Sequence, residues 1–240
     1  MTGEVISPGS ERGNETDNVG ALGLALQENL PEPAFDGLFY WVFGQSFGFP
    51  GGAHNFQNFD FHNDVDTVDD QLAKVLNADS SDLGEFREHG GRLILYHGWA
   101  DPLIPSQTSI NYFNALVEND GGGFQRVGFD RDGTLSKAQS YARLFMVPGM
   151  FHCSGGPGPN VFDALTPLVT WVEKGTAPAT IVATKFVNDT PPAIEMTRPL
   201  CVFPKVAKYN GSGSTSLAQN FSCVTDEHDF NQTPAPQFGP

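Results

Sequence analysis

Asp101 and His152 are the two residues whose types and settings could do chemistry together. Asp101 comes shortly after the apolar run Leu93–His97, and His152 lies in a Gly- and Pro-rich loop after the apolar run Ala142–Val147. A carboxylate can hold the tautomer of an imidazole, and an imidazole in such a loop can act as a general base. Each residue also has an ordinary explanation, since Asp101 could cap a turn and His152 could be a surface residue. The chain order, acid before base, favours two members of a Ser–His–Asp triad.

The serine of that triad is not evident upstream, where the chain order requires it. One G-x-S-x-G string places Ser46 between two glycines, but the next residues are Phe-Gly-Phe-Pro-Gly-Gly. A nucleophilic serine on a sharp turn must open into a helix, and this segment cannot continue as one. Ser106 and Ser109 are better explained as helix-start residues, and Ser154 is too close to His152 to be placed independently. A small complete esterase that uses Ser46 is the lesser alternative.

Strand and helix patterns alternate through the second half of the chain, which predicts an α/β protein with a mostly parallel sheet. Functional residues of such sheets lie just beyond the carboxyl ends of the strands, where Asp101 and His152 are expected. His97 should pack behind the Asp101 loop, and Gly121–Ser140 is expected to be a surface insertion. The expected helices are Val65–Asn77 with Asp64 as N-cap, Ser106–Asn119 and Phe162–Lys174, and the expected strands are Leu93–His97, Ala142–Val147 and Ile181–Val187.

The composition excludes several classes of partner. The 240 residues include 13 basic and 28 acidic side chains, a formal charge of −15, which disfavours nucleic acid and anionic membranes. No segment approaches the roughly 20 apolar residues of a membrane span. Met1–Gly20 lacks the apolar region of a signal peptide. Secretion is nevertheless predicted from N-x-[ST] glycosylation acceptors at Asn14, Asn188, Asn210, Asn220 and Asn231.

The three cysteines cannot all pair within the chain. Cys201 and Cys223 flank a Gly- and Ser-rich loop and could form a local disulfide. Cys153, directly beside His152, then lacks a partner in the chain. A buried free thiol is the alternative for Cys153.

The motifs together resemble one family. The sequence GGRLILYHGWADPLIP at Gly90–Pro105, the loop Met146–Pro159 and the C-terminal cysteine pair are similar to the tannase and feruloyl esterase family. Upstream segments at Pro8–Glu11, Phe39–Gly44 and Phe59–Val65 extend the resemblance over nearly the whole chain. The family comprises secreted α/β-hydrolases with a large lid that act on esters of plant phenolic acids, and it includes hydrolases of polyester monomers.

The resemblance implies a role for each site residue. Asp101 would be the triad acid and His152 the base. Cys153 would form a disulfide with a cysteine directly before the nucleophilic serine, and Cys201–Cys223 would be the C-terminal disulfide. The family's serine motif has no match in this sequence and would belong to an N-terminal half, together with the calcium site of the lid. We therefore expect no metal ligands and no cofactor in this chain.

These implications predict an incomplete α/β-hydrolase fold. Residues 1–64 would be a mostly irregular remnant of the lid, and residues 65–240 the C-terminal part of the hydrolase domain. The chain would be a fragment, a degenerate protein or one subunit of a cleaved enzyme. The expected function is hydrolysis of aryl or phenolic-acid esters, with the serine supplied by a disulfide-linked N-terminal chain, so that the chain alone has little activity. The alternative is a non-catalytic hydrolase fold that serves as an interaction module.

Overall fold

The computed structural model describes residues 63–101, 104–120 and 134–225. Among the described elements, helix α3 (Asp64–Leu76) belongs to a compact unit made of Leu22–Ser80. All later elements belong to a second unit that includes Ser81–Pro240. Within the described ranges, no helix is both long and apolar enough to cross a bilayer.

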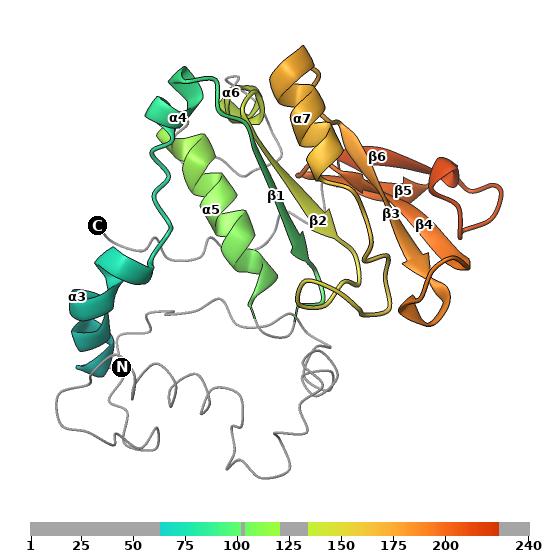
Figure 1. Ribbon diagram of the computed structural model, residues 1–240, viewed down its shortest axis with the longest axis horizontal. Coiled ribbons are helices and arrows are strands. Elements are labelled where there is room, and N and C mark those ends of the chain that lie inside the picture. The colour runs from blue at the N-terminus through green and yellow to red at the C-terminus, as the bar shows by residue number, and fades with distance from the viewer. Residues whose placement is uncertain (1–62, 102–103, 121–133, 226–240) are drawn as a thin grey trace, which may run out of the picture. The chain divides into compact units, whose positions relative to one another are not determined.

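Two parallel strands carry the segments that end at the candidate site (Figure 1). Strand β1 (Leu93–Gly98) pairs with β2 (Ala142–Val147), with Leu93 opposite Ala142 and Gly98 opposite Val147. Because parallel neighbours need a long crossover, the chain between them returns through helices α5 (Ser106–Asn119) and α6 (Thr134–Gln139). Both strands were predicted from their apolar runs, and β1 includes one more residue than expected.

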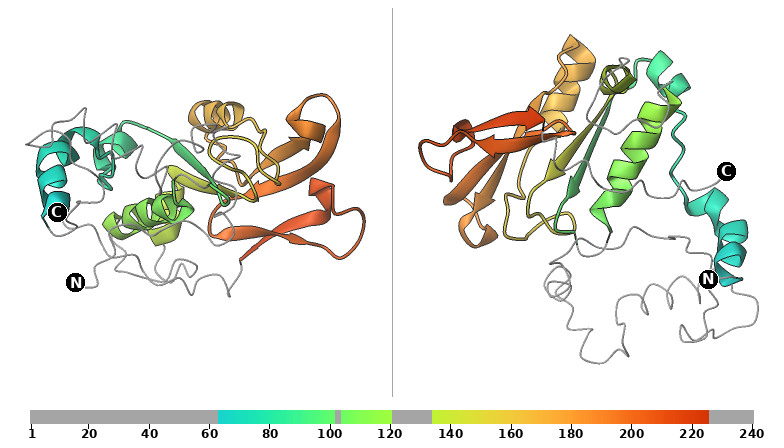
Figure 2. Two further views of the ribbon diagram at one scale, coloured as in Figure 1. Left: turned by 90° about the horizontal axis from the view of Figure 1, so that it is seen from below. Right: turned by 180° about the vertical axis from the view of Figure 1, so that it is seen from behind.

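The side chains of β2 alternate between two hydrophobic clusters, as the period of a strand requires. Leu144 and Met146 pack with Phe113 and its neighbours on α5, whereas Phe145 and Val147 pack with residues of the strands that follow. Helix α7 (Leu165–Lys174) lies on the side of the β1–β2 pair opposite α5 (Figure 2). Strand β2 is buried on both faces, which explains its continuous apolar sequence, whereas β1 is only partly buried.

The later strands form two antiparallel pairs. Strand β3 (Thr180–Phe186) pairs with β4 (Ile194–Cys201), and β5 (Lys205–Tyr209) pairs with β6 (Phe221–Thr225). The expected strand Ile181–Val187 therefore exists, but its partner is antiparallel. The short helices η3 (Val187–Asp189) and η4 (Ala218–Asn220) lie in the connections. The predicted disulfide Cys201–Cys223 is present and joins β4 to β6.

The helix predictions were right in position and partly wrong at the ends. Helix α5 has the predicted bounds, but α7 begins at Leu165 because the Asp163 carboxylate accepts hydrogen bonds from the Leu165 and Thr166 N–H groups. The helix ends at Gly175 in the left-handed conformation expected of a stop signal.

Three further expectations about helices need correction. Asn63, and not Asp64, precedes the first turn of α3. The predicted insertion Gly121–Ser140 includes α6, whose Ala138 is fully buried in the hydrophobic core. Helix α4 (Gly84–Glu88) was not predicted, because five residues are too few to show a helical period.

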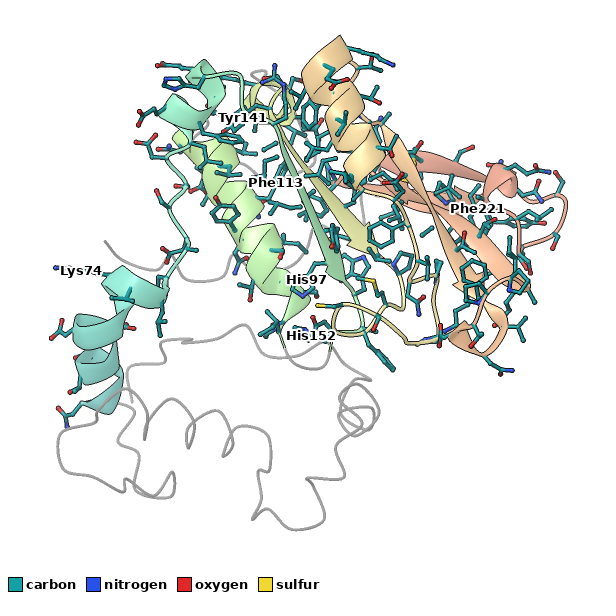
Figure 3. The ribbon with its side chains drawn as sticks, viewed as in Figure 1. Lys74, His97, Phe113, Tyr141, His152 and Phe221 are labelled. Carbon is teal, nitrogen blue, oxygen red and sulfur yellow. A yellow bond between two sulfur atoms is a disulfide. The ribbon has the colours of Figure 1, made fainter. Side chains whose placement is uncertain are left out.

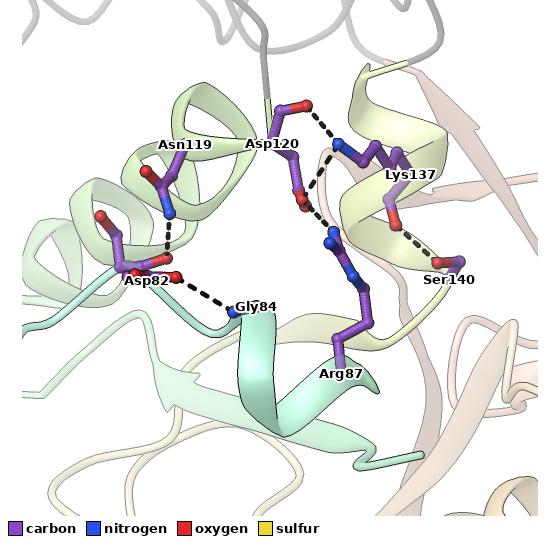
Figure 4. Close-up of polar contacts among 8 residues, drawn as sticks. Asp82, Gly84, Arg87, Asn119, Asp120, Lys137 and Ser140 are labelled. Carbon is purple, nitrogen blue, oxygen red and sulfur yellow. Dashed lines mark hydrogen bonds and ion pairs between the residues drawn. The ribbon is translucent and has the colours of Figure 1, made fainter. Parts of the chain in front are cut away.

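A buried carboxylate joins the helices at one end of the β1–β2 pair (Figure 4). Asp120, at the end of α5, contacts the guanidinium of Arg87 from α4, and the ammonium of Lys137 from α6 lies 3.4 Å from the same oxygen. Tyr141 lies beside them, and burial together with the neighbouring Asp120 raises the pKa of its phenol. In Figure 3, Tyr141 and the pair His97 and His152 lie at opposite ends of the strands.

Candidate active site

Asp101 is held by the turn that follows β1. The residue is 4% exposed, and its N–H donates to the carbonyl of Gly98 over 3.2 Å. One carboxylate oxygen, Oδ1, accepts a hydrogen bond from the Ile104 N–H at 3.0 Å. The ordinary explanation of Asp101 as a turn-capping residue is therefore correct for Oδ1. The other oxygen, Oδ2, remains directed at imidazoles.

His152 is brought to Asp101 by the loop that follows β2. Its Nδ1 lies 3.0 Å from Oδ2 of Asp101, and its side chain is 33% exposed. A carboxylate without a proton accepts a hydrogen bond, so Nδ1 carries the hydrogen and Nε2 has the free lone pair. An imidazole in this tautomer, partly open to solvent, is arranged to take a proton through Nε2.

The two loops touch each other directly beyond the strand ends. The N–H groups of Trp99 and Ala100 donate to the carbonyls of Val147 and Met150 at 2.9 and 3.2 Å. A Cβ atom on Gly98 would lie 2.1 Å from the Met150 carbonyl oxygen, so only glycine permits this approach. The positions of Asp101 and His152 are therefore coupled through backbone contacts.

A buried lysine fastens the far side of the His152 loop. The ammonium of Lys185, on β3, donates to the Gly156 carbonyl and to the Asp189 carboxylate, both at 2.6 Å. Asn160 donates to the same carboxylate oxygen at 2.8 Å. The Lys185 and Asn160 hydrogen bonds lower the pKa of Asp189. The sequence contained no signal for Lys185, because a lysine in a strand is ordinarily exposed.

His97 makes a second imidazole contact with Asp101. Its Nε2 lies 3.2 Å from Oδ2 of Asp101 and 3.0 Å from the Ile104 carbonyl, and its Nδ1 lies 2.7 Å from the Ser109 hydroxyl. The expectation that His97 packs behind the Asp101 loop is confirmed. That it would share the carboxylate oxygen with His152 was missed, because sequence spacing does not place two loops in space.

Cys153 is exposed and carries a free thiol, so the alternative of a buried thiol is wrong. Its backbone has φ 64°, a left-handed conformation that a non-glycine residue adopts at a cost of about 1 kcal/mol. This conformation occurs at the residue directly after His152. The sulfur is therefore accessible to a disulfide partner, and such a bond would lie beside the base.

The structure leaves the nucleophile unassigned. Ser46 lies outside the described residues. Ser106 is 1% exposed, and the hydroxyl of Ser109 is engaged by His97, while both residues lie in the first turns of α5 as expected. Ser154 is exposed in the His152 loop. Among the residues that the structure describes, the candidate acid and base are thus brought together and no nucleophile is assigned.

Three comparisons relate the chain to known proteins. The family model described as tannase and feruloyl esterase matches residues 13–224. An uncharacterized esterase of Xanthomonas campestris is 39% identical over 185 residues, which are 70% of this chain and 32% of that protein. The mono(2-hydroxyethyl) terephthalate hydrolase of Piscinibacter sakaiensis is 43% identical over 147 residues, 61% of this chain and 22% of that protein. A probable feruloyl esterase of Arthroderma benhamiae is 36% identical over 65% of this chain and 27% of its own length.

Solved structures agree with these relatives. An esterase from Aspergillus oryzae superposes with a TM-score of 0.62 at 28% identity, over 77% of this chain and 36% of that one. Tannin acyl hydrolase from Aspergillus niger superposes with a TM-score of 0.61 at 23% identity, over 81% and 34%, and so shares the fold. The fold is therefore that of the tannase and feruloyl esterase type of α/β-hydrolase. The chain matches about a third or less of the length of the curated relatives given above.

Proposed function

Since this chain belongs to the tannase and feruloyl esterase family, and so to a family of carboxylic ester hydrolases, we propose that it supplies the acid and base for cleaving aryl or phenolic-acid esters. The observation that carries the proposal is the 3.0 Å contact between Nδ1 of His152 and the buried Oδ2 of Asp101. The aromatic acyl group is supported by the relatives' names, which include feruloyl esterases and a terephthalate ester hydrolase.

His152 acts twice in the proposed reaction. Its Nε2 takes the proton of a serine hydroxyl while the serine oxygen attacks the ester carbonyl, and the imidazolium then donates that proton to the departing alkoxide or phenoxide. A water molecule repeats the sequence on the acyl-serine and releases the acid. Asp101 stabilises the imidazolium in both halves, because its charge lies against Nδ1 in a buried setting.

The nucleophile, in this proposal, comes from a segment outside the described residues, joined through Cys153. The exposed free thiol beside His152 supports this, because a disulfide there would hold an incoming loop next to Nε2. Among the described strands, β1 pairs only with β2, and in this proposal a further strand pairs with its other edge. Tyr96 on β1 is 50% exposed.

Helix α7 supports the same proposal with an apolar stripe. Leu165, Val169 and Val172 follow a helical spacing, and Leu165 and Val172 are 69% and 58% exposed. Trp171 is buried against Arg92 and Arg143 on the opposite face of the helix. A helix that is apolar on both faces packs between two layers. The stripe is therefore suited to receive further elements of the hydrolase domain.

A single assay tests whether the chain is active by itself. The purified chain is incubated with phenolic methyl esters and a chromogenic acetate, alongside His152→Gln as the control for non-enzymatic hydrolysis. We expect little turnover, because loss of the nucleophile removes most of a triad's contribution. Robust hydrolysis that Ser46→Ala abolishes would replace this proposal with a complete esterase that uses Ser46.

Electrophoresis without reductant tests the role of Cys153. Native material should show a band larger than the 25.9 kDa chain that collapses on reduction. The variant Cys153→Ser should run as the single chain under both conditions. A wild-type chain that runs alone and melts cooperatively as a monomer would contradict the proposed partner.

The exposed apolar residues of α7 also favour the alternative, a non-catalytic interaction module. The two proposals differ in what the partner carries. A partner recovered with the chain is treated with a serine-reactive fluorophosphonate. Labelling of a serine in the partner supports the esterase. If the partner is folded and no serine in it is labelled, the result supports the interaction module.

Two further expectations remain proposals. Within residues 63–101, 104–120 and 134–225, no group of three or more His, Cys, Asp or Glu side chains is arranged to hold a metal ion, and the mechanism above uses no metal or cofactor. Secretion and glycosylation are supported by the exposure of Asn188 and Asn210 and by the disulfide Cys201–Cys223. Deglycosylation of native material followed by mass measurement tests them.

A further inference from the structure

We propose that His97 is a positioning residue, which together with Ser109 fixes the Asp101 carboxylate so that Oδ2 faces His152. The inference rests on the proposed function for the role of His152, but its geometry concerns this chain alone. The contacts of His97 connect three segments, because His97 lies on β1, Ile104 follows the Asp101 turn and Ser109 lies on α5. Figure 3 shows His97 and His152 at the same end of the strands.

The neighbours of His97 determine its tautomer. Nε2 faces the Ile104 carbonyl oxygen at 3.0 Å and Oδ2 of Asp101 at 3.2 Å, and both are acceptors. The hydrogen of the neutral ring must therefore be on Nε2, shared between the two oxygens. Nδ1 is then an acceptor, and the Ser109 hydroxyl at 2.7 Å donates to it. The two acceptors at Nε2 thus select the tautomer that donates to Asp101, and the Ser109 hydroxyl stabilises it by donating to Nδ1.

Both oxygens of the Asp101 carboxylate are held by hydrogen bonds. The Ile104 N–H binds Oδ1, while His97 and His152 both donate to Oδ2. A buried carboxylate needs such donors to remain ionised. Without the His97 donor, Oδ2 would lose one of its two imidazole donors, while the Ile104 and His152 contacts would remain. His97 therefore limits the orientations from which Oδ2 can meet Nδ1 of His152.

The series Ser109–His97–Asp101 has the residue types of a catalytic triad, but its burial differs from that of a reacting group. The His97 side chain is 10% exposed, against 33% for His152, and Ser109 is one turn inside α5. Helical backbone N–H groups beyond the first turn are bonded within the helix and are not free to stabilise an oxyanion. The geometry assigns Ser109 to the orientation of His97 and not to attack on an ester.

Histidine tautomers measured by NMR test the proposal without any turnover. Long-range correlations from the carbon-bound ring protons to the ring nitrogens, in uniformly ¹⁵N-labelled chain at a pH where both rings are neutral, report which nitrogen carries hydrogen. We expect His97 to carry it on Nε2 and His152 on Nδ1. Free neutral histidine populates both tautomers, so a single one at His152 is the signature of an aligned Asp101.

Two variants of His97 form a matched pair. In His97→Gln the amide nitrogen occupies the position of Nε2 and retains the donor to Asp101, whereas in His97→Asn it occupies the position of Nδ1 and does not reach. His152 should keep its single Nδ1–H tautomer in His97→Gln and become a mixture in His97→Asn. Ser109→Ala should leave the hydrogen on Nε2 but shift the ¹⁵N resonance of the His97 Nδ1, which loses its donor, and Ser109→Thr should not.

The proposal is overturned by either of two outcomes: hydrogen on Nδ1 of His97 in the wild type, or an unchanged His152 tautomer in folded His97→Asn. If His97→Asn does not fold, Ser109→Ala decides, since an unchanged ¹⁵N resonance of the His97 Nδ1 there contradicts the role of Ser109. A fluorophosphonate adduct on Ser109 would instead make Ser109 a nucleophile. A chain without esterase activity that shows the expected tautomers would retain this inference and count against the proposed function alone.

Discussion

Two buried carboxylates lie at opposite ends of the β1–β2 pair and are compensated in different ways. Asp120 contacts the guanidinium of Arg87 and lies near the ammonium of Lys137, whereas Asp101 contacts the imidazoles of His97 and His152. Cations cancel the charge of Asp120, so its contribution is to hold helices together. An imidazole that donates a hydrogen bond in its neutral form leaves the charge of Asp101 in place, and that charge can stabilise a proton arriving on His152.

The comparison predicts different consequences when each of the two aspartates is replaced by asparagine. Asp101→Asn, in an assembly that contains the nucleophile, should lower kcat by about 10⁴-fold, because an amide neither holds the tautomer of His152 nor stabilises its imidazolium. The amide would also face the Ile104 N–H or an imidazole donor, at a stability cost of about 1–2 kcal/mol. Ester hydrolysis and urea unfolding measure the two effects.

Near wild-type hydrolysis by Asp101→Asn would remove Asp101 from the triad. The matched control is Asp120→Asn in the same assembly, which should leave the rate per folded molecule unchanged.

The effect of Asp120→Asn should instead appear in stability. The substitution leaves Arg87 without its carboxylate, and since Arg87 is 32% exposed we expect a loss of about 1–3 kcal/mol in the free energy of unfolding. Urea unfolding measures it, with Asp82→Asn as a control for loss of one nearby acidic charge. Unchanged stability would mean that the Arg87 contact contributes nothing.

Tyr141 reports the same substitution spectroscopically. Burial raises the pKa of Tyr141 most, and Asp120 raises it further. Asp120→Asn should therefore lower this pKa without restoring the ordinary value. Titration of the phenol by ultraviolet absorbance measures the shift. A pKa unaffected by the substitution would show that burial accounts for the whole effect.

Lys185 is a cation near the site that is paired with the Asp189 carboxylate, and it extends the comparison to a third ion pair. Lys185→Met should destabilise the chain by about 1–2 kcal/mol and increase hydrogen exchange in the His152 loop, because the Gly156 carbonyl loses its donor. Lys185→Arg is the control that retains a cation.

The pH dependence of this effect has a definite sign. The pKa of Asp189 is lowered in the folded chain, so its contribution to stability is present above the ordinary carboxyl pKa and is lost as the pH falls through the lowered value. The difference between wild type and Lys185→Met should therefore shrink in acid. A difference that grows in acid would contradict the pairing.

Lys137→Met should give the smallest effect. The Lys137 side chain is 50% exposed, and its ammonium lies 3.4 Å from the Asp120 carboxylate and donates to the Asp120 carbonyl at 2.6 Å, so we expect less than about 1 kcal/mol. Urea unfolding checks this value against Asp120→Asn. A loss comparable to that of Asp120→Asn would make Lys137 the main partner of the carboxylate.

Much of the site could be predicted from local sequence. Apolar runs of strand length located β1 and β2, a helical spacing gave α5 its bounds, and the polar loops after the strands held Asp101 and His152. These predictions succeeded because each depends on residues within one element. The predicted start of α7 was wrong because the Asp163 carboxylate caps the helix at Leu165. The prediction of a surface insertion at Gly121–Ser140 missed α6 because the burial of this helix depends on its packing in the core.

The antiparallel pairing of β3 was also beyond the sequence pattern. The mainly apolar segment Ile181–Val187 predicts a strand, but it carries no information on the direction of the neighbour. The buried ammonium of Lys185 follows from that pairing, because β3 brings it under the His152 loop.

By itself, the sequence determined the family, the C-terminal disulfide and the positions of Asp101 and His152 in the loops after two strands. Only the tertiary structure decided that one oxygen of Asp101 caps a turn while the other meets two imidazoles, and that Asp120 meets a guanidinium. The physical reason is that charge and hydrogen-bond contacts act over a few ångströms. Residues that belong to different elements come within that range only when parallel strands place their loops side by side.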